Sequence, residues 1–200
     1  YVFDEKRYFN SGERQQVFLI NNQRVGLTIC EDAWSNVNLE SLPPAYYFMD
    51  KQLDVLINLS ASPYEEEKEN LRDALFSKLA RSCKCTVLMA NIVGGNDDLI
   101  FDGRSLIIND KGLIQYKGAY FEEDLLLEQS KNNHNINLES VAKTQKALIV
   151  GIRDYFKKTH HSTAIIGLSG GIDSAVTCAL AVQALGKENV IGILMPSKYS

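Results

Sequence analysis

One short stretch constrains the fold of this chain more than any other, the run Gly-Leu-Ser-Gly-Gly-Ile-Asp-Ser at 167–174. An apolar, β-branched segment at 163–168 leads into it, and residues 175–185, which end at Gly186, have the composition of a helix. A strand, a glycine turn and a helix in this order leave backbone N–H groups and a helix N-terminus pointing at an anion. The sequence therefore predicts a phosphate-binding loop.

Residues that are missing from this run exclude two other types of phosphate-binding loop. It has no Gly-Lys-Ser/Thr, so it is not the kinase-type P-loop, and the third glycine of a dinucleotide fingerprint is missing. Ser169 and Ser174 add hydroxyl donors near the start of the helix. Asp173 is unexpected beside a polyanion, and a divalent cation held by the carboxylate and the phosphates would resolve the conflict. The alternative is that Asp173 caps the helix.

Composition excludes several classes of protein. With 45% hydrophobic and 23% charged residues, the 200-residue chain is ordinary globular material, and a net charge of −4 gives no basic surplus for nucleic acid. No apolar run reaches the roughly 18 residues of a membrane span, and no signal peptide is visible, so no membrane partner is expected. Four scattered cysteines favour a reducing, cytoplasmic setting over a disulfide scaffold. Because the chain starts at Tyr1 without Met, we expect an internal piece of a longer polypeptide.

The pattern along the chain predicts two domains. A strand-rich domain at 1–125 is followed by a polar linker at 126–137 and by the start of an α/β domain at 138–200, with a helix at 138–158 and a β-α-β unit. In the first domain, Ser62 is expected to cap a long helix that has Pro63 at its first position. Short apolar runs predict strands at 17–20, 25–29, 55–59, 86–90, 105–108 and 113–116.

Cys30 is the candidate nucleophile of the first domain. It stands directly after the apolar strand 25–29 and before Glu31-Asp32. A cysteine at a turn on the carboxyl end of a buried strand is well placed for nucleophilic attack, and the backbone N–H of Glu31 could stabilise an oxyanion. Most free cysteines are instead small buried hydrophobes, so that interpretation stays open.

Several motifs together resemble one enzyme family. The segments FDEKRYF at 3–9, Cys-Glu-Asp at 30–32, Ala-Ser-Pro-Tyr at 61–64 and VGGNDDLIFDGRS at 93–105 resemble the nitrilase-type glutaminase domain of glutamine-dependent NAD synthetases. The run at 167–174 resembles the SGGxDS loop of the ATP pyrophosphatase domain of the same family. The fold that this resemblance implies is α/β: the C-terminal part of a nitrilase-like αββα sandwich, then the start of a doubly wound parallel sheet.

The resemblance also implies roles in glutamine hydrolysis. Cys30 would attack the side-chain amide of glutamine, and the Glu and Lys of the family's catalytic triad lie before Tyr1 in the family pattern. Glu5 matches a supporting carboxylate, although a surface glutamate in a charged run is an equal alternative. Tyr1, Ser62 and Lys68 match positions that bind glutamine; the alternatives are a helix cap for Ser62 and a solvated charge for Lys68.

For the second domain, the resemblance implies ATP and Mg²⁺ as cofactors, with Asp173 on the metal. The implied reaction is amidation of deamido-NAD to NAD through an adenylate, with glutamine, ATP and deamido-NAD as small-molecule substrates and a homo-oligomer as the assembly. Alternatives are another ATP pyrophosphatase amidotransferase, a nitrilase-type amidase or a non-catalytic interaction module. The ATP-binding residues would be Gly167, Leu168, Ser169, Gly170, Gly171, Ile172, Asp173 and Ser174.

Two further patterns are expected to carry no metal. His160 and His161 are neighbours whose side chains are expected to point apart, and we expect them to lie in a solvated loop. Cys83 and Cys85 lack the second ligand pair of a zinc site.

Overall fold

The computed structural model describes residues 7–10, 12, 15–34, 43–127 and 138–196. Two of the predicted site residues, Tyr1 and Glu5, lie outside this part, as do most of the predicted linker residues 126–137, so the domain boundary stays a prediction. The chain forms two compact units. The first comprises residues 1–60, 73–89 and 107–115, and the second comprises 61–72, 90–106 and 116–200.

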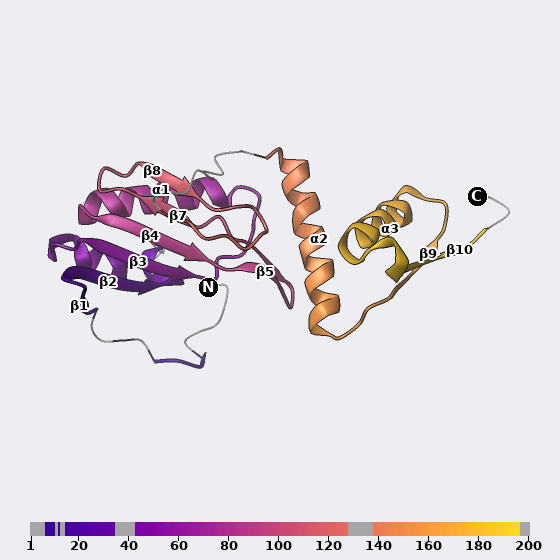
Figure 1. Ribbon diagram of the computed structural model, residues 1–200, viewed down its shortest axis with the longest axis horizontal. Helices are drawn as coiled ribbons and strands as arrows, with labels where there is room; N and C mark the ends of the chain where they lie inside the picture. The colour runs from indigo at the N-terminus through magenta and orange to yellow at the C-terminus, as the bar shows by residue number, and fades with distance from the viewer. Residues whose placement is uncertain (1–6, 11, 13–14, 35–42, 128–137, 197–200) are drawn as a thin grey trace. The chain divides into compact units, whose positions relative to one another are not determined.

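A mixed sheet organises the first unit, in the strand order β1-β2-β3-β4-β7-β8 (Figure 1). β1 and β2 form an antiparallel hairpin through Asn21 and Asn22, whose φ angles of 50° and 63° suit a two-residue turn. β2 and β3 run parallel, with Ile29 opposite Leu59. The bounds are β1, Val17–Ile20; β2, Gln23–Ile29; β3, Val55–Ser60; β4, Thr86–Asn91; β7, Leu106–Ile108; and β8, Ile114–Lys117. These six strands lie close to the six predicted runs.

Helix α1, Lys68–Cys83, supplies the apolar face that packs with this sheet. Phe76, Leu79 and Ala80 are fully buried, as are Leu56 of β3 and Val87 of β4. The helical spacing of these positions buries one stripe of the helix. Leu71 lies outside this stripe and is exposed, whereas the next residue, Arg72, is buried.

The predicted start of this helix was wrong. Ser62 does not cap it, because α1 begins at Lys68 and Pro63 pairs with Phe101 in an isolated β-bridge. The Ser62 N–H donates to Asn91 Oδ1 (2.8 Å), and Asn91 Nδ2 donates to the Ser62 carbonyl (3.3 Å). A long-range pairing with Asn91 therefore replaces the local capping box.

In the second unit, a hairpin packs on a long helix. Strands β5, Val93–Asn96, and β6, Leu99–Asp102, are antiparallel, and α2, Ser140–Lys158, lies against both. The glycine-rich composition of β5 gave no strand signal, so the hairpin was not predicted. The apolar cluster behind it consists of Tyr120, Phe121, Ala147 and Val150, with Tyr64, Ile100 and Leu138 at its edge.

The predicted β-α-β unit is confirmed. β9, Ala164–Leu168, and β10, Val190–Leu194, pair in parallel with Leu168 opposite Leu194, and α3, Ile172–Leu185, connects them and contacts both. α2 also contacts α3. In the part of the chain that is described, no helix is both long enough and apolar enough to span a bilayer.

Candidate functional site

Cys30 lies at the turn that ends β2 and opens a short 3₁₀ segment, Cys30–Ala33. Its φ is +43°, a left-handed backbone conformation that costs a non-glycine residue about 1–3 kcal/mol. The Asp32 carboxylate holds the turn by accepting a hydrogen bond from the Ile29 N–H (2.8 Å). A strained turn of this kind presents a nucleophile at the end of a strand. The side chain of Cys30 is neither fully buried nor fully exposed.

A buried polar group supports this turn from the neighbouring strand. Asn58 of β3 is fully buried, and its Nδ2 donates to Thr28 Oγ1 (3.0 Å) and, at the longer distance of 3.5 Å, to the Cys30 carbonyl. Ser60 donates to Asn58 Oδ1 (2.5 Å). Sequence analysis missed Asn58 and Ser60. The sequence feature that could have indicated them is a pair of polar residues at alternate positions of an apolar strand, which therefore face the same side of the sheet.

The thiols of Cys83 and Cys85, also in the first unit, are buried, unlike that of Cys30. Burial raises the pKa of Cys83 to about 11 and that of Cys85 to about 12. Both thiols are therefore protonated and unreactive at neutral pH. No group of three or more metal-ligating side chains exists among the described residues.

Ser62 and Lys68 belong to the second unit, whereas Cys30 belongs to the first. That the three meet in one glutamine pocket remains a prediction. Ser62 is 3% exposed, and its buried Oγ has no hydrogen-bond partner among the described residues, so it keeps its capacity to bind a ligand. The Lys68 side chain is 16% exposed and pairs with Glu65 at 2.8 Å, so it is not simply a solvated charge.

Glu69, the residue after Lys68, accepts hydrogen bonds from several cationic side chains and from a tyrosine. Burial alone would raise the pKa of Glu69, but hydrogen bonds from Tyr120 and Lys143 and the charge of Arg104 outweigh it and lower the pKa to about 2. This carboxylate therefore stays ionised and ties α1 to α2. Its donors are Tyr120 Oη at 2.6 Å, Lys143 Nζ at 2.9 Å, Arg104 Nη2 at 2.9 Å and Lys117 Nζ at 3.4 Å.

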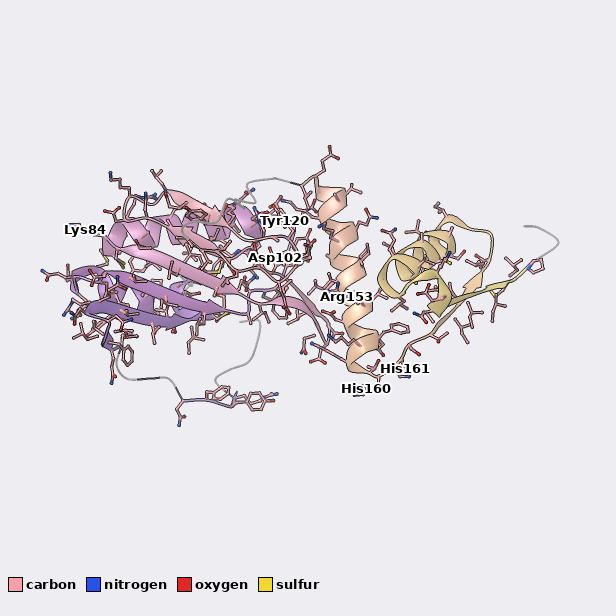
Figure 2. All side chains as sticks on the ribbon, in the orientation of Figure 1. Lys84, Asp102, Tyr120, Arg153, His160 and His161 are labelled. Atoms are coloured by element: carbon pink, nitrogen blue, oxygen red, sulfur yellow. The ribbon has the colours of Figure 1, made fainter. Side chains whose placement is uncertain are left out.

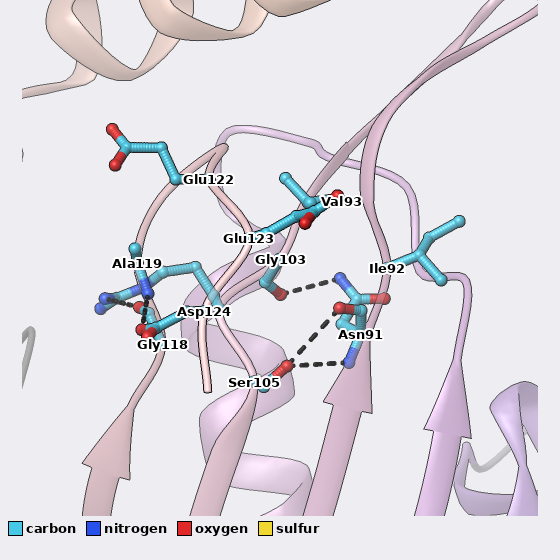
Figure 3. Close-up of a pocket in the computed structure, with 11 residues that line it drawn as sticks. Asn91, Ile92, Val93, Gly103, Ser105, Gly118, Ala119, Glu122, Glu123 and Asp124 are labelled. Atoms are coloured by element: carbon cyan, nitrogen blue, oxygen red, sulfur yellow. Dashed lines mark hydrogen bonds between the residues drawn. The ribbon is translucent and has the colours of Figure 1, made fainter. Parts of the chain in front are cut away.

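A polar pocket of about 390 Å³ opens beside this network (Figure 3). Asn91 and Ser105 lie on one side of it and are joined by the hydrogen bond from the Asn91 N–H to Ser105 Oγ (3.0 Å). Glu122, Glu123 and Asp124 also line it. None of the described residues predicted to bind glutamine or ATP lines this pocket.

The predicted phosphate loop joins β9 to α3 within the second unit. Gly170 has a φ of +88°, and Gly171 is the N-cap residue of α3. Three hydrogen bonds hold the loop: Gly171 N to Ser169 Oγ (3.4 Å), Ser174 Oγ to the Gly171 carbonyl (2.9 Å), and the contact between the two serine hydroxyls (3.3 Å). The first backbone N–H groups of α3 have no intrahelical carbonyl to bind, so they can bind an anion.

The role of Asp173 on a metal stays a prediction. Asp173 lies in the first turn of α3 rather than at the N-cap, so the capping alternative is wrong. Its carboxylate is exposed and has no hydrogen-bond partner among the described residues. It is therefore free to bind a hard cation, whose remaining ligands would come from phosphates and water. His160 and His161 lie just after the C-terminal end of α2 (Figure 2) and, within the described part, belong to no metal-binding cluster.

These features define a class of protein. One chain carries a mixed α/β sheet with a strained cysteine turn and a β-α-β unit whose glycine turn is predicted to bind phosphate. A carbon–nitrogen hydrolase from Helicobacter pylori G27 has the same fold as the first part, with a TM-score of 0.53 at 24% identity over 61% of this chain and 46% of that one. A family model described as NAD synthase matches residues 144–200.

The chain is homologous over its whole length to glutamine-dependent NAD(+) synthetases. Those from Synechocystis sp. and Thermotoga maritima are 42% and 36% identical, over 100% of this chain and 38% and 41% of their own lengths. The chain therefore spans about two fifths of these curated relatives. The glutamine-dependent NAD+ synthetase from Acinetobacter baumannii, solved in complex with adenosine diphosphate, matches with a TM-score of 0.87 at 36% identity, over 100% of this chain and 39% of that one.

Proposed function

We propose that this chain is part of a glutamine-hydrolysing NAD synthase, a ligase that amidates deamido-NAD to NAD. The observation that carries the proposal is the pairing, in one chain, of a cysteine at φ +43° on the end of a parallel strand with a phosphate loop at the N-terminus of α3. Neither element alone selects this reaction, because each serves several enzyme classes. The homology across the whole chain supports the combination.

In the first reaction, the Cys30 thiolate attacks the amide carbon of glutamine. The proton that the thiol gives up passes to the amide nitrogen, so the tetrahedral intermediate, stabilised by the Glu31 N–H, collapses to a γ-glutamyl thioester and neutral ammonia. Water then hydrolyses the thioester to glutamate and the free thiol. Ser62 and Lys68 are the proposed contacts for the amino-acid end of glutamine. The orphaned Ser62 Oγ and the low exposure of Lys68 support that assignment.

In the second reaction, the loop at 167–174 binds the phosphates of ATP. The nicotinate carboxylate of deamido-NAD attacks the α-phosphorus, pyrophosphate leaves, and ammonia then displaces AMP to give NAD. A Mg²⁺ ion would neutralise the phosphate charge, with the unpartnered Asp173 carboxylate as its protein ligand. The absence of a P-loop lysine agrees with attack at the α-phosphorus rather than γ-phosphoryl transfer.

Cys30→Ala in the full-length enzyme tests the proposal. We expect loss of glutamine-supported NAD synthesis with ammonia-supported synthesis retained, because only the first reaction uses the thiol. Loss of both activities, or of neither, would overturn the assignment. A strict requirement for deamido-NAD and ATP separates this function from a stand-alone amidase, from another amidotransferase and from a non-catalytic module.

We also propose a homo-oligomeric, cytoplasmic enzyme. A cytoplasmic setting is consistent with the small number and scattered placement of the four cysteines. Light scattering of the full-length enzyme after size exclusion would measure the oligomeric state, and a monomer would reject that part of the proposal.

A further inference from the structure

Two side chains on α2 form hydrogen bonds with the backbone of Gly95 in the β5–β6 hairpin, one with its N–H and one with its carbonyl. Asp154 Oδ2 accepts a hydrogen bond from the Gly95 N–H (2.8 Å), and Lys158 Nζ donates to the Gly95 carbonyl (2.6 Å) and to Asn96 Oδ1 (2.8 Å). Asp154 and Lys158 are four residues apart and so share one helix face. We call these contacts the hairpin clamp.

Glycines allow the clamp to form. A Cβ on Gly95 would lie 3.2 Å from the Cα of Gly151 on α2, and one on Gly94 would lie 2.7 Å from Asp154 Oδ2. A Cβ on Gly151 would lie 2.9 Å from Ile100 Cδ1. The backbones of hairpin and helix therefore touch, and a larger residue at these positions would push them apart. This close approach accounts for the Gly94-Gly95 pair, which packing periodicity left unexplained.

The other end of the hairpin is bonded to the predicted glutamine-binding segment. Asn91, the last residue of β4 and two residues before β5, accepts from the Ser62 N–H and donates to the Ser62 carbonyl. Asn91 Nδ2 also donates to Asp102 Oδ1 at the end of β6 (3.1 Å). The base of the hairpin is thus fixed to Ser62 while its middle is fixed to α2.

The same helix leads directly to the phosphate loop. α2 ends at Lys158, the residue that closes the clamp. Five residues separate Lys158 from β9, which runs into the loop at 167–174. An unbroken series of hydrogen bonds and covalent segments therefore runs from Ser62 through the hairpin and the clamp to β9. Contiguous networks of this kind can carry energetic coupling between sites.

Packing by itself does not require the clamp. The apolar cluster around Tyr120 and Val150 already holds α2 nearer its N-terminal half. Lys158 and Asn96 are both exposed, and their contact with each other adds little to stability. Their geometry fixes where the hairpin lies rather than whether the unit folds.

We propose that Asp154 and Lys158 are positioning residues that couple glutamine hydrolysis to NAD synthesis by holding the β5–β6 hairpin against α2. This inference rests on the proposed function. When the clamp is broken, the hairpin no longer transmits the state of the nucleotide site to the Ser62 segment. Glutamine is then hydrolysed without matching synthesis.

The test uses the full-length enzyme with Lys158→Met and Asn96→Ala. Glutamate and NAD are measured in the same reaction with glutamine, and NAD alone with ammonia. We expect both variants to raise the ratio of glutamate to NAD by roughly threefold or more, while ammonia-supported synthesis stays within about twofold of wild type. Lys157→Met, which removes the adjacent exposed lysine, is the matched control and should keep the wild-type ratio. Lys158→Arg should restore it.

An unchanged ratio in both variants, or an equal fall in all three measurements, would overturn the coupling role. Asn96→Ala decides the matter if Lys158→Met folds poorly, because it removes one exposed acceptor of the clamp and, beyond it, an exposed hydrogen bond to Asp97. A wild-type enzyme that makes NAD from neither glutamine nor ammonia would reject the proposed function instead.

Discussion

Arg72 and Asp102 form a buried, two-pronged ion pair. Arg72 Nη1 lies 3.0 Å from Asp102 Oδ1 and Nη2 lies 2.6 Å from Oδ2, and the side chains are only 1% and 3% exposed. Arg72 comes from α1 and Asp102 from the end of β6, so the pair ties the helix to the base of the hairpin. Asp102 also binds Asn91, which holds the Ser62 segment.

Removing one partner of this pair should destabilise the protein strongly. Asp102→Ala would leave the Arg72 guanidinium buried without its counter-charge, and we expect the free energy of unfolding to fall by about 3–5 kcal/mol. Urea unfolding measures it. Arg153→Met, which removes an exposed ion pair with Asp154, is the control and should change stability by less than about 1 kcal/mol. Similar losses in both variants would contradict the prediction.

Stability should fall in acid because of Glu69. Its pKa in the folded protein is about 2, below the ordinary value of 4.5, so its contribution is complete above pH 4.5 and is lost as the pH falls from 4.5 toward 2. Glu69→Gln removes this titration. We expect the wild-type protein to lose more stability than the variant between about pH 5 and about pH 3. Equal losses in parallel urea titrations would show that Glu69 is not responsible.

Asn58→Ala should impair glutamine hydrolysis and leave ammonia use intact. The change removes the side chain that bonds Thr28 and the Cys30 carbonyl, so the strained turn loses its support. Loss of such buried hydrogen bonds costs about 1–3 kcal/mol, and a loss of that size in the transition state corresponds to a fall of roughly 5-fold to 160-fold in kcat/KM for glutamine. Ammonia-supported synthesis by the full-length variant is the internal control. A fall in ammonia use by the same factor would indicate a general loss of structure.

Gly170→Ala should weaken ATP binding. Alanine at a φ of +88° is strained by about 1–2 kcal/mol, and relief of the strain would move the loop's N–H groups away from the phosphates. Gly186→Ala is a matched control, since Gly186 has a φ of +89° at the other end of α3. Calorimetric titration of the full-length enzyme with ATP should show weaker binding for the first variant only. If both weaken binding equally, loop geometry is not the cause.

Local patterns predicted much of this protein. The strand, glycine turn and helix around 163–185 could be read because hydrophobic period and turn chemistry are encoded over a few neighbouring residues. The turn after 25–29 likewise marked Cys30, and the asparagine pair at 21–22 marked a hairpin. Prediction from a local pattern failed where a residue binds a distant partner instead. The capping box predicted at Ser62 does not form, because Ser62 pairs with Asn91.

Only the tertiary structure brought distant partners together. Asn58 and Thr28, Arg72 and Asp102, and Gly95 and Asp154 are 30, 30 and 59 residues apart along the chain. No local period specifies such pairs, because each depends on the path of the chain between them. The sequence by itself determined the glycine turn between β9 and α3 and the position of the candidate nucleophile at the end of β2. The fold decided which buried polar groups support the cysteine turn and which helix holds the glycine-rich hairpin, because a buried polar group or charge is stable only where folding supplies its partner.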